Sequence, residues 1–232
     1  SMGLRFCPLF SGSDGNCCFL EVDNRRYLID AGFSGKKIES NLKILGIDPS
    51  TIDLIFLTHE HIDHIRGAGV LSRRYDIKIC SNVETLRAGA SKLVKIKDEN
   101  IVVIGTEKKH RFSLFDLYTL EISHDCARGM GFIFNTDYGK VSLLTDTGII
   151  TNHMKEKIKG SKIFYFEANH DLDMLKNGPY DYNLKQRILG DFGHISNVTS
   201  GNVLSEVVTD KCKNVYLGHL SETNNEEKLA YD

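Results

Sequence analysis

The chain has 232 residues, of which 41% are hydrophobic and 26% are charged, and its formal net charge is −2. This composition is typical of a globular protein with a sizeable core and argues against disorder. The slight negative charge gives no global positive field, so a nucleic acid would have to be bound locally. No apolar run reaches the roughly 18 residues that a membrane helix needs, so membrane insertion is not expected.

The chain contains no linker-like stretch, internal repeat or low-complexity segment, so we expect a single domain over residues 1–232. Its six cysteines form no CxxC pair, and the start Ser1-Met2-Gly3 lacks the apolar core of a signal peptide. These features predict a cytoplasmic protein. A homodimer is left open.

Short apolar segments rich in β-branched and aromatic residues predict strands. In chain order they are 4–10, 17–22, 26–30, 54–58, 78–80, 101–104, 112–123, 131–135, 141–145, 163–167 and 215–217. Helical spacing or caps predict helices at 35–45, 82–89, 149–159, 183–189 and 198–208, with another beginning at Glu222. Turns are expected at Asp76 and at Tyr138-Gly139. Helices between the strands favour an α/β fold of two sheets with helices outside.

The run His59-Glu60-His61-Ile62-Asp63-His64 follows the apolar segment 54–58 and places four metal-binding side chains within six residues. On an extended segment His59 and His61 point the same way, while Asp63 and His64 begin a turn that can face a second ion. Imidazole and carboxylate suit zinc, and also manganese or iron. Glu60 lies outside this register and is given no metal role. An ordinary polar surface turn is the alternative interpretation.

Three further candidate ligands each follow an apolar strand: His124, Asp146 and His219. Ligands at the ends of several strands of one scaffold can converge on a single centre. Taken singly, each would more often be an ordinary loop residue.

Together these residues resemble the metallo-β-lactamase superfamily, whose signature HxHxDH is matched in full at 59–64. The resemblance implies an αββα sandwich of two mixed β-sheets with helices on the outer faces. It also implies two divalent ions, most simply zinc. One ion would be held by His59, His61 and His124, the other by Asp63, His64 and His219, and Asp146 would be shared. A shared carboxylate offsets the repulsion between two ions and leaves room for a water that both polarise.

Segments 11–17, 167–171, 193–197 and 217–225 resemble the YycJ (WalJ) family of bacterial exonucleases. That resemblance implies a DNA exonuclease acting 5′ to 3′. The more distant tRNase Z enzymes use a glutamate and a histidine, matching Glu167 and His194, in proton transfer near the scissile phosphate.

The chemistry of the residues supports such a transfer. His194 can protonate a leaving alkoxide while Glu167 orients its imidazole, although a histidine before a helix is often only a cap. Asp63, Glu167 and His194 are therefore the candidate catalytic residues. His170 and Asp171 are candidates for contacts around the ligands or with substrate.

Other polar segments have simpler interpretations. For the glycine-rich segment 11–17, including Asn16, turn geometry alone is favoured over a role beneath the metals. The basic runs at 73–74, 108–111 and 185–187 are interpreted as solvated surface. No aromatic motif that reads base identity is present, so binding to a nucleic-acid backbone with little sequence preference is expected.

The sequence thus predicts a dinuclear phosphodiesterase that acts on DNA. Two alternatives stay open: hydrolysis of a small ester, thioester or lactam at the same centre, and a non-catalytic regulatory module of cell-wall signalling. The family usually continues further beyond its last histidine than this chain does, so a short C-terminus is also considered.

Overall fold

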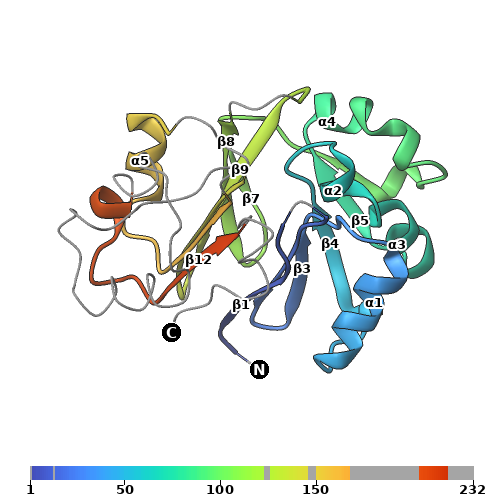
Figure 1. Ribbon diagram of the computed structural model, residues 1–232, viewed down its shortest axis with the longest axis horizontal. Coiled ribbons are helices and arrows are strands. Elements are labelled where there is room, and N and C mark those ends of the chain that lie inside the picture. The colour runs from blue at the N-terminus through green and yellow to red at the C-terminus, as the bar shows by residue number, and fades with distance from the viewer. Residues whose placement is uncertain (1, 13, 123–125, 146–149, 168–203, 219–232) are drawn as a thin grey trace.

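Two six-stranded sheets face each other in the computed structural model, which describes residues 2–12, 14–122, 126–145, 150–167 and 204–218 (Figure 1). The first sheet has the order β1-β2-β3-β4-β5-β6. Its strands are β1 (Leu4–Phe10), β2 (Cys17–Val22), β3 (Arg25–Ile29), β4 (Ile52–Phe56), β5 (Lys78–Ser81) and β6 (Ile101–Val103). The second sheet has the order β12-β11-β10-β9-β8-β7. Its strands are β7 (Lys109–Arg111), β8 (Phe115–Ile122), β9 (Gly129–Thr136), β10 (Gly139–Thr145), β11 (Ile163–Glu167) and β12 (Asn214–Gly218).

Both sheets are mixed. In the first, β1, β2 and β3 pair antiparallel, and β3 to β6 pair parallel. In the second, β7 to β10 pair antiparallel, whereas β10, β11 and β12 pair parallel. Strands β8, β10, β11 and β12 therefore run in one direction and end at the same edge of their sheet.

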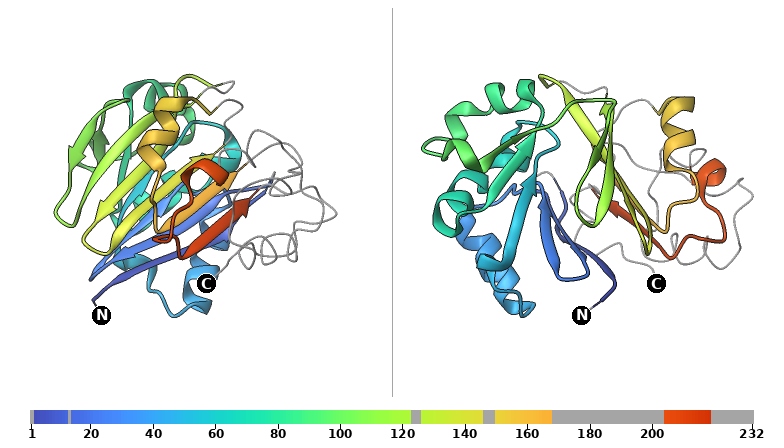
Figure 2. Two further views of the ribbon diagram at one scale, coloured as in Figure 1. Left: turned by 90° about the vertical axis from the view of Figure 1, so that its left-hand side faces the viewer. Right: turned by 180° about the vertical axis from the view of Figure 1, so that it is seen from behind.

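Helices cover the outer face of each sheet, as both views of Figure 2 show. The first sheet carries α1 (Gly35–Ile44), α2 (Ile62–Ile65), α3 (Ala68–Tyr75) and α4 (Val83–Ala88). The second carries α5 (Asn152–Ile158) and the helical residues 204–207. The described part of the chain also contains short 3₁₀ turns at Pro49–Thr51, Ala90–Lys92 and Asp98–Asn100. The αββα arrangement expected from the sequence is confirmed.

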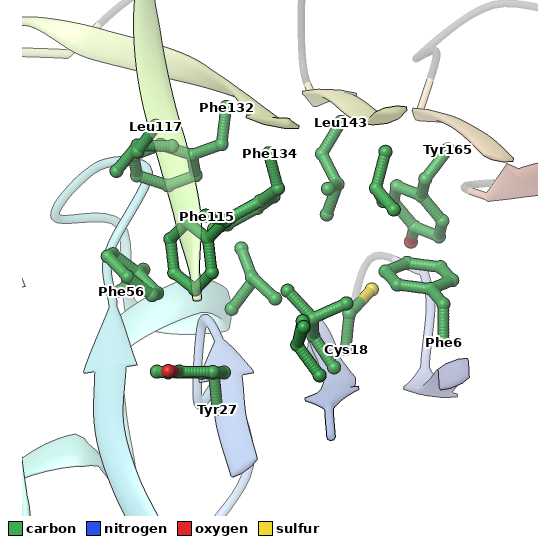
Figure 3. Close-up of a cluster of buried hydrophobic side chains, with 14 of the residues drawn as sticks. Phe6, Cys18, Tyr27, Phe56, Phe115, Leu117, Phe132, Phe134, Leu143 and Tyr165 are labelled. Atoms are coloured by element: carbon green, nitrogen blue, oxygen red, sulfur yellow. The ribbon is translucent and has the colours of Figure 1, made fainter. Parts of the chain in front are cut away.

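Three apolar clusters hold these layers together. The central cluster lies between the sheets, where Phe56 and Tyr27 of the first sheet point toward Phe134 and Phe115 of the second (Figure 3). A second cluster packs α1 and α3 against the first sheet, and a third packs α5 against the second. Because strand side chains alternate between faces, each sheet can contribute to two of these clusters.

Several element predictions need correction. The predicted strand 112–123 is β8 alone, preceded by a separate β7 that lies within the basic run at 108–111. Helices α2 and α3 were not predicted, and the Asp76 turn is the left-handed residue that ends α3 (φ 58°). The predicted helix 198–208 is described only from residue 204, where 204–207 are helical. The predicted helices at 183–189 and from Glu222 lie outside the described residues.

The basic runs agree with their interpretation as surface where they are described. Arg73 and Arg74 are exposed, with Arg73 donating to the carbonyl of Val94 and Arg74 to Glu39. The run at 185–187 lies outside the described residues. No helix in the described part of the chain is both long and apolar enough to span a membrane.

Candidate metal centre

The segment that leaves β4 brings the four side chains of the HxHxDH motif together. The ring centroids of His59 and His61 are 4.8 Å apart, and those of His59 and His64 are 4.0 Å apart. Asp63 Oδ2 lies 3.6 Å from His64 Nε2. His59 and His64 are buried, whereas His61 and Asp63 are partly exposed. The structure therefore places these four side chains near one another, with part of the group open to solvent.

A buried carboxylate, Asp30, organises the two buried imidazoles. Its Oδ1 accepts the Thr58 amide at 2.8 Å, and its Oδ2 accepts the Thr58 hydroxyl at 2.8 Å and His64 Nδ1 at 2.6 Å. The Thr58 hydroxyl donates to Asp30, so it accepts from His59 Nδ1, 2.9 Å away. Because both Nδ1 atoms carry a proton, Nε2 of each ring is the unprotonated nitrogen, the one that can bind a metal ion. This is the arrangement by which outer carboxylates and hydroxyls orient metal-binding histidines.

The sequence pattern predicts Asp30 only as the last residue of the strand 26–30 and gives it no functional role. It directly follows β3 and has a left-handed backbone (φ 64°), an uncommon conformation outside glycine. Its amide donates to the carbonyl of Phe56, which fixes the turn against β4. The sign of Asp30 in the sequence is that a charged residue ends an apolar strand. Its partner Thr58 is 28 residues away, and only the parallel pairing of β3 with β4 brings the two together.

Asn16 does more than shape a turn, so the interpretation favoured for it was wrong. It is 3% exposed, and its Nδ2 lies 3.3 Å from Asp63 Oδ2 and 3.2 Å from His64 Nε2. Its amide donates to the carbonyl of Asp63, while its side chain also closes the turn at Gly12. Asn16 thus links the glycine-rich segment to Asp63 and His64, two of the predicted ligands of the second ion.

Gly32 lets the backbone approach Asp63 closely. A Cβ at this position would lie 1.7 Å from the carbonyl oxygen of Asp63 and 2.6 Å from the amide nitrogen of Asn16. These are backbone atoms, which cannot swing aside as a flexible side chain can. Only glycine is compatible with the packing of the ligand segment at this point.

The second sheet meets this segment at the ends of its strands. The amide of Met130 in β9 donates to the carbonyl of Thr58 at 2.9 Å, which joins the two sheets beside the ligands. Thr145, Glu167 and Gly218 are neighbours in register at the ends of β10, β11 and β12. Thr145 Oγ1 is buried, and the described residues offer it no hydrogen-bond partner. The strands that precede Asp146 and His219 therefore end at one edge of the second sheet.

The segment after His124 is held by side chains of the first half of the chain. Glu60 Oε2 accepts the amide of Ala127 at 2.9 Å, and Asn82 Nδ2 donates to the carbonyl of Arg128 at 2.9 Å. Asn82 also caps α4, because its Oδ1 accepts the amide of Thr85. Glu60 therefore has a positioning contact, in keeping with its place outside the ligand register.

Four predicted site residues lie outside the described residues: His124, Asp146, His194 and His219. The same holds for His170 and Asp171, and for Glu167 only the backbone position is described. Among the described residues no three histidine, cysteine or acidic side chains form a metal-holding group. In the predicted scheme the described histidines and Asp63 supply two ligands to each ion, and the remaining ligands lie outside the described residues. The donor chemistry, with imidazoles already oriented by Asp30 and Thr58, fits divalent metal ions.

Cys17 is adjacent to Asn16 in sequence and packs in the buried cluster beneath α1. Burial, together with the nearby charge of Asp30, raises the pKa of the Cys17 thiol well above its ordinary value. The raised pKa keeps the Cys17 thiol neutral, which suits its packing role in this apolar cluster.

Comparisons with known proteins identify the family of the chain. The family model described as "Metallo-beta-lactamase superfamily" matches residues 11–134. The chain is 38% identical to exodeoxyribonuclease YycJ of Bacillus anthracis over 229 residues, which are 99% of this chain and 87% of that protein. It is 37% identical to exodeoxyribonuclease WalJ of Streptococcus pneumoniae serotype 2 (strain D39 / NCTC 7466), over 99% of this chain and 86% of that protein. Among solved structures, the metallo-β-lactamase fold protein YhfI from Bacillus subtilis superposes with a TM-score of 0.71 at 14% identity, covering 94% of this chain and 86% of that one.

Proposed function

The chain belongs to the metallo-β-lactamase superfamily and, within it, to the family of the exodeoxyribonucleases YycJ and WalJ, and from this we propose that it is a metal-dependent exonuclease degrading DNA from the 5′ end. The observation that carries the proposal is the match to YycJ over 99% of this chain, because it includes the ligand segment and both sheets. The 5′ polarity rests on the family resemblance.

The proposed centre holds two divalent ions. His59, His61 and His124 would hold the first, Asp63, His64 and His219 the second, and Asp146 would bind both. Zinc is the expected metal, with manganese or iron as alternatives, because this donor set accepts all three. When bound, two such ions supply a water of lowered pKa and offset the negative charge of a phosphodiester.

The protein's own residues orient the site and move a proton. Asp30 and Thr58 keep Nδ1 protonated on His64 and His59, so each ring presents Nε2. In the proposed scheme His194 protonates the leaving alkoxide and Glu167 holds its imidazole. The backbone of Glu167 lies between Thr145 and Gly218 at the sheet edge, which supports a role beside the metals.

The proposal also covers the domain organisation, the localisation and the oligomeric state of the protein. Residues 1–232 would form one domain, since both sheets share the central apolar cluster. A DNA substrate would place the protein in the cytoplasm. Oligomeric state, including the homodimer left open by the sequence, can be measured by light scattering.

Duplex DNA labelled separately at either 5′ or 3′ ends tests the activity. We expect metal-loaded protein to release the 5′ label first as mononucleotide, and Asp146→Ala to abolish release. Intact DNA with every metal tried would contradict the nuclease, and earlier loss of the 3′ label would contradict the polarity. Hydrolysis of a thioester but not of DNA would instead favour the small-substrate alternative.

Metal identity requires a separate measurement. Elemental analysis of the protein as isolated should give two metal ions per chain, and replacement with zinc, manganese or iron should rank their activities. A single ion per chain at saturation would contradict the dinuclear scheme.

The role of His194 has a test that depends on the leaving group. His194→Ala should slow DNA cleavage by about 10²- to 10⁴-fold, the usual contribution of a general acid. Methyl 4-nitrophenyl phosphate should be much less affected, because 4-nitrophenolate leaves without needing a proton. Equal losses on both substrates would show that His194 acts on structure or metal binding instead.

A further inference from the structure

Two partly exposed phenylalanine rings and a lysine form a small cluster on the first sheet, which we call the aromatic platform (Phe10, Phe33 and Lys37). The ring centroids of Phe10 and Phe33 are 4.5 Å apart, with the planes inclined at 55°. Lys37 Nζ lies 4.1 Å from the Phe33 centroid and 5.5 Å from that of Phe10. Both rings rest on the buried cluster beneath α1 and keep part of their surface in solvent.

The platform adjoins the segment that touches the predicted ligands of the second ion. Phe33 packs so closely on Gly15 that a Cβ there would lie 2.5 Å from Phe33 Cδ2. Gly15 precedes Asn16, whose side chain contacts both Asp63 and His64. Phe33 also follows Gly32, which packs directly against the backbone of Asp63. The rings are thus fixed on the same backbone segments that position Asp63 and His64.

Charge around the platform favours an anionic partner. Lys36 and Lys37 are both exposed at the start of α1, and the first turn of that helix contains no acidic residue. The two rings alone would suit any apolar group. The platform lies beside a centre proposed to cleave phosphodiesters. Its aromatic rings match the base of a nucleotide, and the adjacent ammonium groups match the phosphate.

We propose that the aromatic platform binds the DNA strand next to the scissile phosphate, with Phe33 and Phe10 contacting a nucleobase and Lys37 contacting a backbone phosphate. The inference rests on the proposed function and adds a subsite to it. Every base has a π-face, so this contact tolerates all sequences. It gives a chain of slight net negative charge a local means of holding a polyanion.

The test uses the full-length, metal-loaded protein and three variants. Phe33→Leu removes the ring but keeps an apolar side chain on the buried cluster, Lys37→Gln removes the charge, and Lys43→Gln is the matched control. Lys43 is exposed in the last turn of the same helix. Two readouts are taken: kcat and KM on DNA and on methyl 4-nitrophenyl phosphate, and binding of a nuclease-resistant phosphorothioate strand carrying 2-aminopurine near its 5′ end.

Phe33→Leu should weaken DNA binding by about tenfold, in line with the loss of one base–aromatic stack, and should remove most of the 2-aminopurine quenching. Its kcat/KM should fall more for DNA than for the small phosphodiester, chiefly through KM. Lys37→Gln should lower the salt dependence of binding, and Lys43→Gln should match the wild type in both assays. Phe33→Tyr, which restores a ring, should recover the quenching.

The outcomes separate this inference from the proposed function. Unchanged DNA affinity and quenching in Phe33→Leu would overturn the platform even if the enzyme degrades DNA. A wild-type protein that binds and quenches the strand but cuts no DNA would overturn the nuclease while supporting the platform. Failure of Phe33→Tyr to recover quenching, although it is folded by circular dichroism, would also count against stacking.

Discussion

Asp30 stabilises two imidazoles at once while its own backbone is left-handed (φ 64°). Asparagine tolerates this conformation and keeps the size of the side chain, but it lacks the charge that favours protonated Nδ1 atoms. We expect Asp30→Asn to weaken zinc affinity by about 10- to 100-fold, as changes in the residues around metal ligands usually do. Zinc competition against a chromogenic chelator measures this.

Asp23→Asn is the matched control for that experiment. Asp23 also has a left-handed backbone (φ 54°), and its carboxylate accepts from the amide of Gly3 and from the Tyr138 hydroxyl, away from the ligand segment. It should change stability without changing zinc affinity. Equal zinc affinity in Asp30→Asn and the wild type would show that Asp30 serves the turn only.

At the scale of elements, α4 and the segment after β8 share one side chain. Asn82 caps α4 and also binds the carbonyl of Arg128. Asn82→Ala should therefore cost more than the roughly 1 kcal/mol of a lost N-cap, because a partly buried carbonyl loses a donor as well. Urea unfolding measures the lost stability. Zinc affinity, measured by titration, should also fall, because residues 126–128 follow the predicted ligand His124.

Ser34→Ala is the comparison for Asn82→Ala. Ser34 caps α1 through the amide of Lys37 and is exposed, so its loss removes a cap and nothing more. Zinc affinity should be retained in Ser34→Ala. If both variants lose the same stability and keep full zinc affinity, the link through Asn82 has no part in holding the metal centre.

Strands β1, β2 and β3 are joined by a charged cluster centred on Glu21. Glu21 is 5% exposed and accepts from Arg5 at 2.8 Å and from Arg26 at 2.7 Å. Burial alone would raise the pKa of Glu21, but the hydrogen bonds from Arg5 and Arg26 hold the pKa below its ordinary value. A lowered native pKa stabilises the fold above the pKa of the unfolded state, and that stability is lost as pH falls through the native pKa.

Comparing Glu21→Gln with the wild type across pH tests this. The wild type should be more stable by about 1 kcal/mol at pH 7, a modest value because Arg5 is largely exposed. The advantage should begin to shrink below the ordinary glutamate pKa of 4.5, where the unfolded chain binds the proton first, and should be lost once native Glu21 is protonated. Denaturant titrations at pH 7 and pH 4, with Glu156→Gln as the exposed control, measure it. An advantage independent of pH would mean that packing accounts for the effect.

The elements that could be predicted are those whose pattern is local. Strands such as β2 and β4 are mainly apolar, with one acidic residue each, and α1 has a cap and a regular apolar face. Helix α3 contains Gly69, a poor helix former, and its stability comes from packing Ala68 and Leu71 on the first sheet. β7 has a basic sequence and is a strand only because it pairs with β8. Packing and pairing of this kind cannot be read from one segment.

The same distinction applies to the site. His59, His61, Asp63 and His64 could be found because their spacing is local. The contacts of Asn16 with Asp63 and His64 cross 47 and 48 residues, so their sequence neighbourhoods give no hint of them.

At the scale of the whole molecule, the proposed ligands come from both sheets, so metal binding should stabilise the complete fold. Ligand binding to the native state adds RT ln(1 + [L]/Kd), about 4 kcal/mol at a free metal concentration of 1,000 Kd. For a chain of this size that is about a 10 °C rise in Tm. Thermal unfolding with increasing zinc measures it, and chelator should reverse it. Asp63→Ala should show a smaller rise, and a zinc-independent Tm in the wild type would contradict a centre that joins the sheets.

The first and last described strands meet across the sandwich. The hydroxyl of Tyr216 in β12 donates to the carbonyl of Phe6 in β1 at 3.3 Å, and their rings pack edge to face at 5.3 Å. A nascent chain has made Phe6 long before Tyr216 leaves the ribosome. The part of β1 that receives Tyr216 therefore lacks this contact until a further 210 residues have been made. Until β12 has been made, the growing polypeptide is a natural client for chaperones.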